Sequence, residues 1–454
     1  MNENKIKIAI IGGGVAGISA AVELCSKNIP FCLFEQRINL GGRASSFLDK
    51  ETNETIDNGQ HLISGAYHNF LSTLSKLGTD KYFFRQNGLL VPFLEKKEIN
   101  KNDYEINKDF FNTAVLPGKA GKILGLLNLK SLNFESKLNI IKLFIKFQNK
   151  SFQVENKRVI DFLKEQKQTD VAIKYFWEPV VLATLNASVQ TSSSLLLAEV
   201  LKRAFFSDSK SSALLFPSIG LSDYYANLES IINKNNSKLF LNKRIIQIVP
   251  KKIGFEILCS DSSKFDADYV ISAIPQYSLM KILPAEIIKN PFFNEMKNYK
   301  YSPILSIYLW YEKEIFSDMF AALIGSRFHW LFNRNDYVKR KNALYSYTLT
   351  TSFADDLINL NHTKLLNLIS EELKIFLNTK EKPKYIKIIK ERRATLLITP
   401  EIEEKRYISE TIIPGLFFAG DWTATGLPAT IEGAAQSGVE AAKMVSISPY
   451  AFPS

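Results

Sequence analysis

The chain has 454 residues, of which 46% are hydrophobic and 23% charged. This composition is typical of a globular protein, and the length exceeds one ordinary core, so two domains are expected. The 57 basic and 46 acidic residues give a net charge of +11, which suits a nucleic acid, an anionic membrane or a phosphate-rich ligand. The lysines are spread along the chain without an aromatic RNA-binding box or a helix-turn-helix pattern, and we therefore exclude nucleic acid as a partner.

The cysteine, histidine and hydropathy patterns further limit the class of protein. Cys25, Cys32 and Cys259 form no Cys-x-x-Cys pair, which predicts a reducing, cytoplasmic location rather than a disulfide framework. Only four histidines occur, scattered along the chain, so no metal site is predicted. No uncharged apolar run reaches the ~18 residues that a membrane-spanning helix needs, and an integral membrane protein is not expected.

The first 35 residues have the pattern of a βαβ unit. A β-branched run at Lys5–Ile11 precedes clustered glycines, a helical pattern over Val15–Lys27 and a second apolar strand at Pro30–Phe34. Alternation of strand, helix and strand over this length is typical of a doubly wound parallel sheet. The sequence therefore predicts an α/β fold with a Rossmann-like domain at the N-terminus.

The glycines between strand and helix carry a dinucleotide-binding fingerprint. Gly12, Gly14 and Gly17 have the spacing that allows a tight turn, close approach of the backbone to a pyrophosphate and close packing of helix on strand. The N-terminus of the helix offers free N–H groups to the anion. Glu35, at the end of the second strand, is placed to accept hydrogen bonds from ribose hydroxyls and disfavours a 2′-phosphate. An ADP-containing dinucleotide is predicted.

The rest of the chain alternates between two kinds of segment. Residues from about 86 to 205 are mostly helical in pattern. Strands are predicted at Ser237–Ile248, Gly254–Cys259, Asp268–Ala273, Ile304–Tyr311, Leu344–Thr350, Tyr385–Glu391 and Gly415–Ala419, and an amphipathic helix at Thr363–Leu377.

Two further glycine-containing segments accompany the fingerprint. Gly42 and Arg43 follow soon after the predicted ribose-binding acid and place a cation beside the phosphates. Near the C-terminus, Gly420–Asp421 ends a short strand, and the Thr430–Ile431 pair opens a run of glycine and alanine. This pattern suits a strand, loop and helix whose N-terminus faces a ligand, with the aspartate binding a ribityl or phosphate-side hydroxyl.

Together these segments resemble the FAD-binding amine oxidase and phytoene desaturase superfamily. The resemblance implies FAD as cofactor and a fold in which an α+β substrate domain interrupts a bipartite FAD-binding domain. We accordingly assign 1–85, 206–275 and 395–454 to the FAD-binding domain, and 86–205 and 276–394 to the substrate-binding domain.

The same resemblance implies that Ile245 contacts adenine through its backbone. An ordinary core residue of a β-strand is the alternative for this position.

Four blocks resemble a narrower family, the hydroxysqualene dehydroxylases or squalene-associated FAD-dependent desaturases. They are Ile56–Tyr67, Phe176–Pro179 with Ala183–Asn186, Arg393–Thr395 and Gly420–Thr430. The sequence departs from that family at residues 187–189, where Ala-Ser-Val replaces its usual Thr-Pro-Pro. The resemblance implies an apolar isoprenoid substrate and the reductive removal of an allylic hydroxyl from hydroxysqualene, giving squalene for hopanoids or related terpenoids.

Other activities remain open at this point. A carotenoid-type desaturase would act oxidatively on the same substrate class, and an amine oxidase comes third. A non-enzymatic prenyl-lipid carrier of the Rab GDP-dissociation inhibitor kind resembles this fold, but Gly420 to Gly438 retains the complete flavin segment. The dinucleotide fingerprint is single, so the electron donor is unidentified and could be a protein or a quinone.

Two side chains of the Ile56–Tyr67 block are candidates for catalysis. We predict that His61 supplies the proton for the departing hydroxyl, because imidazole can be charged near neutral pH. Asp57 would orient this histidine or bind the flavin. The alternative is a structural histidine in a loop. Phe176 and Trp177 are expected to line or seal an apolar cavity, and Glu178 is either a weaker catalytic candidate or an acid at a helix N-terminus.

The segment Lys119–Lys150 combines seven lysines with an apolar face. As an amphipathic surface segment it would bind an anionic membrane and hold the protein peripherally on the inner face. As a pair of ordinary helices it would bury the same face in the core of the substrate domain.

Overall fold

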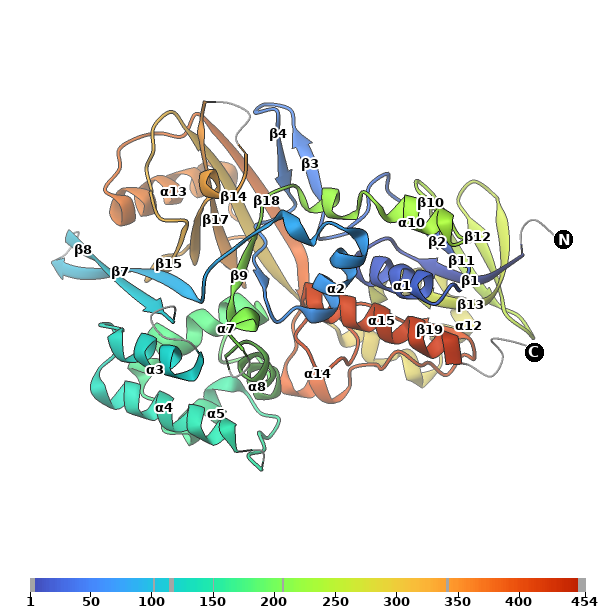
Figure 1. The fold of residues 1–454 in the computed structure, drawn as a ribbon, viewed down its shortest axis with the longest axis horizontal. Coiled ribbons are helices and arrows are strands. Elements are labelled where there is room, and N and C mark those ends of the chain that lie inside the picture. Colours follow the sequence, from blue (N-terminus) through green and yellow to red (C-terminus); the bar gives the residue numbers. More distant parts are fainter. Residues whose placement is uncertain are drawn as a thin grey trace.

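The computed structural model describes residues 5–100, 103–113, 118–149, 151–205, 208–339 and 343–447. Parts of the predictions for the two termini, for position 150 and for the start of the segment at 206 lie outside these ranges. Figure 1 shows two lobes, with both ends of the chain at one lobe and the helices α3, α4 and α5 at the far side of the other. The chain passes between the lobes several times.

A seven-stranded sheet forms the centre of the first lobe. Its order is β10-β2-β1-β13-β12-β11, and β19 also pairs with β13. Pairing is parallel among β10, β2, β1, β13 and β19, and antiparallel for β12 with its two neighbours. The strands are β1 (Lys5–Ile11), β2 (Cys32–Phe34), β10 (Lys238–Phe240), β11 (Ile245–Pro250), β12 (Phe255–Cys259), β13 (Lys264–Ser272) and β19 (Leu416–Phe418). The predicted Rossmann-like sheet is thus assembled from three separate parts of the chain.

One predicted strand of this sheet was wrong. The run Ser237–Ile248 is two strands, because the chain turns after β10 with Asn242 in the left-handed region at φ 53°. Asparagine tolerates this conformation, which ends an extended strand. β10 then pairs in parallel with β2, whereas β11 begins an antiparallel pair with β12.

Helices cover the sheet where glycine permits close approach. A Cβ on Gly17 would lie 1.9 Å from the Gly12 carbonyl oxygen, and one on Gly438 would lie 2.0 Å from that of Ala16. Only glycine fits at such contacts, so α1 packs tightly on the turn before it and on α15. The helices of this lobe are α1 (Val15–Ser26), α2 (His68–Leu77), α10 (Leu228–Lys234), α11 (Gln276–Ile282), α12 (Ala285–Ile288), α14 (Pro400–Glu404) and α15 (Ile431–Ile447).

Short strands connect the two lobes. β3 (Ser46–Asp49) and β4 (Glu54–Asp57) form a hairpin, and β5 (Ile63–Ser64) and β6 (Phe83–Arg85) both pair with β9 (Leu214–Pro217). The loop that follows β4 carries the residues of the Ile56–Tyr67 block toward the second lobe.

A second seven-stranded sheet has the order β18-β14-β17-β16-β15-β7-β8. Leu305, Ile307 and Leu309 point to one face and pack with the apolar side of α13 (His362–Leu377) in a common core. The strands are β7 (Leu90–Asn100), β8 (Asp103–Asn112), β14 (Tyr301–Tyr311), β15 (Phe320–Ile324), β16 (Trp330–Asn333), β17 (Tyr345–Ser352) and β18 (Tyr385–Leu396). Side chains alternate along a strand, so the even-numbered positions near residue 304 face the other way.

The expectation of mostly helical structure from residue 86 was wrong for its first part. β7 and β8 form an antiparallel hairpin, and β7 pairs in parallel with β15, more than 200 residues further along the chain. Such non-local pairing overrides local propensity. The helical part comprises α3 (Gly118–Asn128), α4 (Phe134–Gln148), α5 (Val159–Glu165), α6 (Asp170–Ala172), α7 (Glu178–Leu185), α8 (Ser194–Val200) and α9 (Ser209–Ser212).

Pro179 shapes the longest of these helical runs. The residues Ile173–Trp177 form a π-helical turn that joins α6 to α7 without a break. Proline has no N–H to donate within a helix, and a wider turn before it accommodates that loss. Glu178 therefore lies inside a continuous helical run rather than at a helix N-terminus, which corrects that alternative. Burial raises its pKa.

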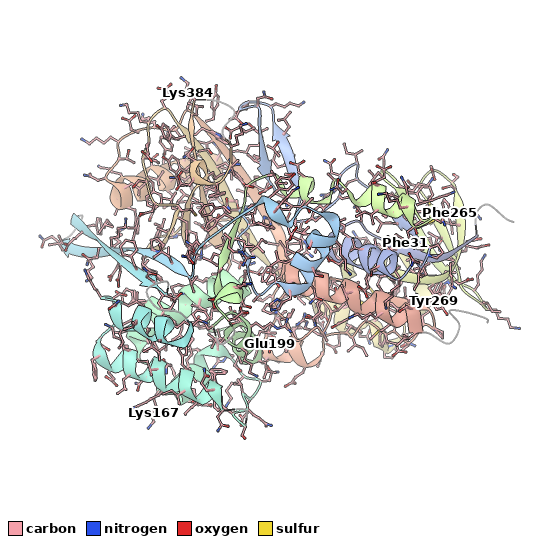
Figure 2. The ribbon with its side chains drawn as sticks, viewed as in Figure 1. Phe31, Lys167, Glu199, Phe265, Tyr269 and Lys384 are labelled. Atoms are coloured by element: carbon pink, nitrogen blue, oxygen red, sulfur yellow. The ribbon has the colours of Figure 1, made fainter. Side chains whose placement is uncertain are left out.

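Within the ranges given above, no helix has the length and apolar content needed to cross a bilayer. Charged side chains lie over the whole surface. Lys167 and Lys384, for example, project from opposite margins of the second lobe (Figure 2).

Candidate active site

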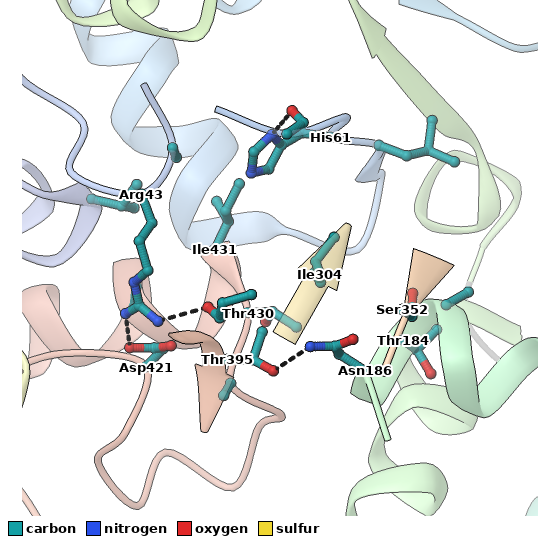
Figure 3. Close-up of a pocket in the computed structure, with 18 of the residues that line it drawn as sticks. Arg43, His61, Thr184, Asn186, Ile304, Ser352, Thr395, Asp421, Thr430 and Ile431 are labelled. Atoms are coloured by element: carbon teal, nitrogen blue, oxygen red, sulfur yellow. Dashed lines mark hydrogen bonds and ion pairs between the residues drawn. The ribbon is translucent and has the colours of Figure 1, made fainter. Parts of the chain in front are cut away.

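One continuous cavity of about 560 Å³ runs between the two lobes. At one end it is lined by the glycine turn, Glu35 and the Gly42–Arg43 loop, and at the other by apolar side chains of the second lobe. Figure 3 shows Arg43 and Asp421 on one side, Thr184 and Ser352 on the other, and His61 with Ile304 between them. Of the predicted site residues, the cavity lining contains Gly12, Gly14, Glu35, Gly42, Arg43, His61, Gly420, Asp421, Thr430 and Ile431.

The glycine turn has the shape that a pyrophosphate needs. Gly12 has φ 106°, and a Cβ there would lie 2.9 Å from the carbonyl oxygen of Ala273. A Cβ on Gly14 would meet no atom within 4 Å, so the open side of this residue faces the cavity. Gly14 also caps α1 without a side-chain bond, which leaves the first N–H groups of a twelve-residue helix for an anion.

Glu35 is fixed beside this turn. Its Oε2 accepts a hydrogen bond from the Gly13 amide at 2.7 Å, and its Oε1 accepts one from the Arg37 amide at 2.8 Å. The side chain is buried but lines the cavity. Each carboxylate oxygen can accept a second bond, so the group can also receive ribose hydroxyls as the sequence predicts.

Arg43 joins the N-terminal and C-terminal parts of the chain at the nucleotide end of the cavity. Its Nη2 lies 2.5 Å from Asp421 Oδ1, and its Nη1 donates to the carbonyl oxygen of Ala394 at 2.7 Å. Burial opposes the charge on Arg43, but the Asp421 carboxylate holds its pKa above the usual range. A fixed cation and anion are therefore paired where the phosphate and ribityl parts of a dinucleotide would lie.

A second helix N-terminus faces the same space. Thr430 and Ile431 stand at the start of α15 and line the cavity, and the Thr430 hydroxyl accepts from the Gly433 amide at 3.3 Å. The seventeen-residue helix directs the positive end of its dipole to this point. Burial raises the pKa of the neighbouring Tyr67 to about 12, so that phenol stays neutral.

His61 lies over the sheet of the second lobe with a defined proton arrangement. Its Nδ1 lies 2.7 Å from the carbonyl oxygen of Gly59, which only a protonated Nδ1 can satisfy. Burial lowers the pKa of His61, and the bond to Gly59 only partly offsets this effect. The premise that the ring is charged near neutral pH is thus corrected. Nε2 of the neutral ring is an acceptor, so in this state His61 can accept a hydrogen bond but has no free proton to donate from that nitrogen.

Asp57 lies outside the cavity lining. Its Oδ1 accepts from the Leu221 amide at 3.0 Å, and its carbonyl oxygen accepts from the Tyr308 hydroxyl at 3.0 Å. Burial raises the pKa of Asp57 to about 7. No hydrogen bond between Asp57 and His61 occurs in the described part of the chain, so the contacts of Asp57 join β4 to neighbouring elements instead of orienting the imidazole.

Two of the predicted cofactor residues also stand back from the cavity. Gly17 packs against Gly12 and supports the turn from behind. Ile245 is 8% exposed at the start of β11, two residues after Lys243, whose amide donates to the carbonyl oxygen of Glu35 at 2.8 Å. The backbone before Ile245 is thus beside Glu35, and the contact with adenine stays a prediction.

The far half of the cavity is apolar. Phe176 lines it as predicted, whereas Trp177 is fully buried in the core and donates from Nε1 to Gln168 Oε1 at 2.9 Å. A second π-helical run, Leu201–Phe205, follows α8, and its last residue, Phe205, also contributes to this wall. The apolar lining includes Leu89, Val91, Phe93, Phe111, Val180, Ala183, Val200, Ala204, Leu214, Phe320, Trp330 and Phe332.

Sequence reasoning gave no role to two polar residues of the cavity. Asn186 is buried at φ 48°, donates from Nδ2 to Thr395 Oγ1 at 2.8 Å and accepts from the Phe353 amide at 2.7 Å. Glu391 accepts from Asn58 Nδ2 at 3.2 Å. Local patterns give no signal for such pairs, because their partners lie far apart in the chain.

Fold and site together define an oxidoreductase that binds a dinucleotide next to an apolar substrate chamber. The chain belongs to the flavin containing amine oxidoreductase family, whose model matches residues 15–446. It is 24% identical to the hydroxysqualene dehydroxylase of Sinorhizobium fredii, over 96% of this chain and 97% of that protein. It is 21% identical to the 15-cis-phytoene desaturase of Solanum lycopersicum, over 95% of this chain and 76% of that protein.

The fold is shared with a putative protoporphyrinogen oxidase from Exiguobacterium sp. (TM-score 0.72, 13% identity, 98% of this chain and 99% of that chain).

Membership of the family confirms an FAD-dependent oxidoreductase. The residues present fit that cofactor, because the glycine turn is open on the cavity side and two helix N-termini face the same space. Gly14, Glu35, Arg43 and Asp421 would hold its nucleotide and ribityl parts.

Proposed function

We propose that the protein is an FAD-dependent oxidoreductase of isoprenoid metabolism that converts hydroxysqualene to squalene by reductive dehydroxylation. The continuity of the cavity carries this proposal: the dinucleotide site opens directly into a chamber lined by aromatic and aliphatic side chains. A long hydrocarbon with one polar group fits such a lining. Similarity to hydroxysqualene dehydroxylases along nearly the whole chain supports the same substrate.

The side chains of the chamber have separate tasks in this reaction. FAD in its reduced form supplies hydride chemistry. The apolar wall excludes water, so an allylic cation would escape capture. The neutral His61 ring offers Nε2 to the hydroxyl of the substrate and holds it in one orientation. A group that donates a proton to the departing hydroxyl is also required.

An anaerobic experiment tests the proposal. The purified protein is reduced without oxygen, hydroxysqualene is added, and the visible absorbance of the flavin and the lipid products are followed. Reoxidation of the flavin with formation of squalene is expected. A protein that keeps its flavin but shows no reoxidation would instead be tested, in its oxidised form, with phytoene, because the similarity to phytoene desaturases makes that reaction the alternative. Protein without any flavin would indicate the lipid carrier.

We further propose that the protein works in the cytoplasm, peripherally attached to the inner face of an anionic membrane. On α4, Ile140, Leu143 and Phe144 are buried in the core, but a second stripe at Phe134, Leu138 and Ile145 is exposed. The exposed side chains of Phe134 and Ile145 are 78% and 62% accessible.

The lysines near this stripe support the same orientation. Lys130, Lys142 and Lys146 are exposed close to it in sequence, whereas Lys122 is buried and donates to the carbonyl oxygen of Phe205. Apolar side chains flanked by lysine are typical of helices that insert shallowly into anionic bilayers. The electron donor for the flavin remains unidentified.

A further inference from the structure

A row of three side chains crosses the sheet beneath His61. Glu391 on β18 lies directly opposite Ile304 on β14, and Ile304 lies directly opposite Ser352 on β17. Directly opposed residues of antiparallel strands point to the same face and are about 5 Å apart at their Cβ atoms. All three line the cavity. Across three neighbouring strands, the sheet therefore presents a carboxyl, an apolar side chain and a hydroxyl side by side to the cavity.

The loop that carries His61 covers this row. Asn58 Nδ2 donates to Glu391 Oε2 at 3.2 Å. The Gln60 amide donates at 3.4 Å to Oγ of Ser306, which is two residues after Ile304 on β14. The Arg393 amide donates to the second oxygen of Glu391 at 3.2 Å. The carboxyl is thus held from two sides and remains in contact with the cavity.

Glu391 also lies at the junction of the two halves of the chamber. Glu391 is three positions before Ala394 in β18, and the carbonyl oxygen of Ala394 accepts a hydrogen bond from Arg43. At a rise of about 3.3 Å per residue, the backbone of Glu391 is roughly 10 Å along the strand from that of Ala394. Glu391 therefore lies between the nucleotide end and the apolar end of the cavity.

Seven other ionisable side chains line the cavity among the described residues. They are Glu35, Arg37, Arg43, His61, Tyr67, Tyr277 and Asp421. Glu35 and Asp421 accept hydrogen bonds in the nucleotide half of the cavity. The neutral His61 ring donates its one N–H to the carbonyl oxygen of Gly59. Among the described residues that line the cavity, Glu391 is the carboxyl that faces the apolar half.

We propose that Glu391 is a further catalytic residue, whose carboxyl protonates the hydroxyl group that leaves the substrate. This inference rests on the proposed function. The C–O bond breaks with both electrons passing to oxygen, which takes the proton of Glu391 and departs as water. The allylic carbon gains a hydride from reduced FAD, so one C–H bond forms and the cofactor is oxidised by two electrons. A separate two-electron donor then restores it, and solvent returns a proton to Glu391.

The carboxylate that remains after proton transfer has a second effect. It lies in the same chamber as the positive charge that develops on the allylic carbon, where low polarity strengthens their attraction. The Glu391 carboxyl therefore first donates the proton and then stabilises the positive charge.

Substitution of Glu391 tests the proposal in the flavin-containing protein. E391Q keeps an acceptor for Asn58 but has no acidic proton. We expect unchanged flavin content, hydroxysqualene binding within about threefold of the unmodified protein, and anaerobic flavin reoxidation slowed by roughly 10² to 10⁴-fold. E391D, which keeps the proton one methylene away, should be intermediate. A rate within threefold for E391Q, or a loss confined to substrate binding with an unchanged maximal rate, would overturn the proposal.

A matched control separates the acid from general effects of the substitution. Glu404 accepts a hydrogen bond from Asn156 Nδ2 at 3.1 Å, the same kind of pair, but lies outside the cavity lining. E404Q should retain the full rate. If the unmodified protein itself fails to reoxidise with hydroxysqualene, the proposed function fails first. If it reacts and E391Q reacts equally fast, only the role of Glu391 is refuted.

Discussion

Arg43 and Asp421 lie 378 residues apart in the chain and form an ion pair of 2.5 Å between Nη2 and Oδ1. The pair joins the loop after the first βαβ unit to the loop before the last helix, at the point where both line the cavity. Because Arg43 also donates to Ala394 on β18, one guanidinium group fixes both parts of the nucleotide site to the substrate-binding sheet. The two ends of the chain thereby form one site.

The ion pair predicts coupled effects on cofactor binding. D421N should weaken FAD binding by about tenfold, or ~1.4 kcal/mol, because Arg43 loses its charged partner. The measurement is a titration of the apo-protein with FAD. The double variant R43Q/D421N should bind FAD no more weakly than the worse single variant, since each change already breaks the pair. Losses that simply add would show that the two residues act independently.

The open side of Gly14 predicts a steric effect. G14V places a branched side chain where no atom lies within 4 Å and where the pyrophosphate is expected. The protein should fold but be isolated without yellow colour, and G14A should retain part of its flavin. Flavin and protein absorbance give the ratio. A fully yellow G14V protein would contradict the assignment of the glycine turn.

His61 predicts a loss of turnover without a loss of cofactor. H61A removes the acceptor Nε2, and we expect roughly 10²-fold slower turnover with unchanged flavin content. Because burial lowers the pKa of His61, the ring is already neutral near pH 7, and raising the pH from about 6 to 8 should not reduce activity through this group. H68A, at an exposed histidine outside the cavity lining, is the control. Normal turnover of H61A would remove His61 from the mechanism.

Asp57 predicts a dependence of stability on pH. Its pKa is raised to about 7 by burial, so between pH 4 and 7 the folded protein binds a proton that the unfolded chain releases. The stability that this carboxyl contributes is complete below its unfolded pKa and is lost as the pH rises through about 7. D57N should therefore be more stable than the unmodified protein above pH 7, on the order of 1 to 3 kcal/mol.

Thermal unfolding midpoints at several pH values check this expectation. Asparagine can still accept the hydrogen bond from the Leu221 amide, so the change removes the charge and keeps the contact. Parallel pH profiles for D57N and the unmodified protein would show that Asp57 is ionised in the folded state.

The exposed stripe of α4 predicts binding to anionic vesicles. The protein should sediment with vesicles containing phosphatidylglycerol, and less so at high salt, because lysine attraction is screened. F134S/I145S should reduce this binding at least severalfold, since two apolar anchors are lost. I253S changes an 85% exposed isoleucine of the other lobe and serves as the control. Equal loss in both variants would refute a specific membrane face.

Local motifs identified most of the residues that line the cavity where the nucleotide is expected. The spacing of Gly12, Gly14 and Gly17, and the acid after the second strand, follow from what a tight phosphate-binding turn demands of neighbouring residues. Such demands act over a few residues and are therefore visible in the sequence. The interleaving of two domains was also evident, since strands of different lobes alternate along the chain.

The sequence itself thus determined the cofactor, the fold class and the apolar nature of the substrate. Only the tertiary structure decided that residues 90–100 and 103–112 are strands, that Asp57 faces Leu221, and that Glu391 meets Asn58 across 333 residues. Each of these three features depends on which strands pair and on which side chains become buried. Both are set by contacts between segments that are distant in the sequence. Burial is the main cause that lowers the pKa of His61 and raises that of Asp57, and burial cannot be read from the neighbouring sequence.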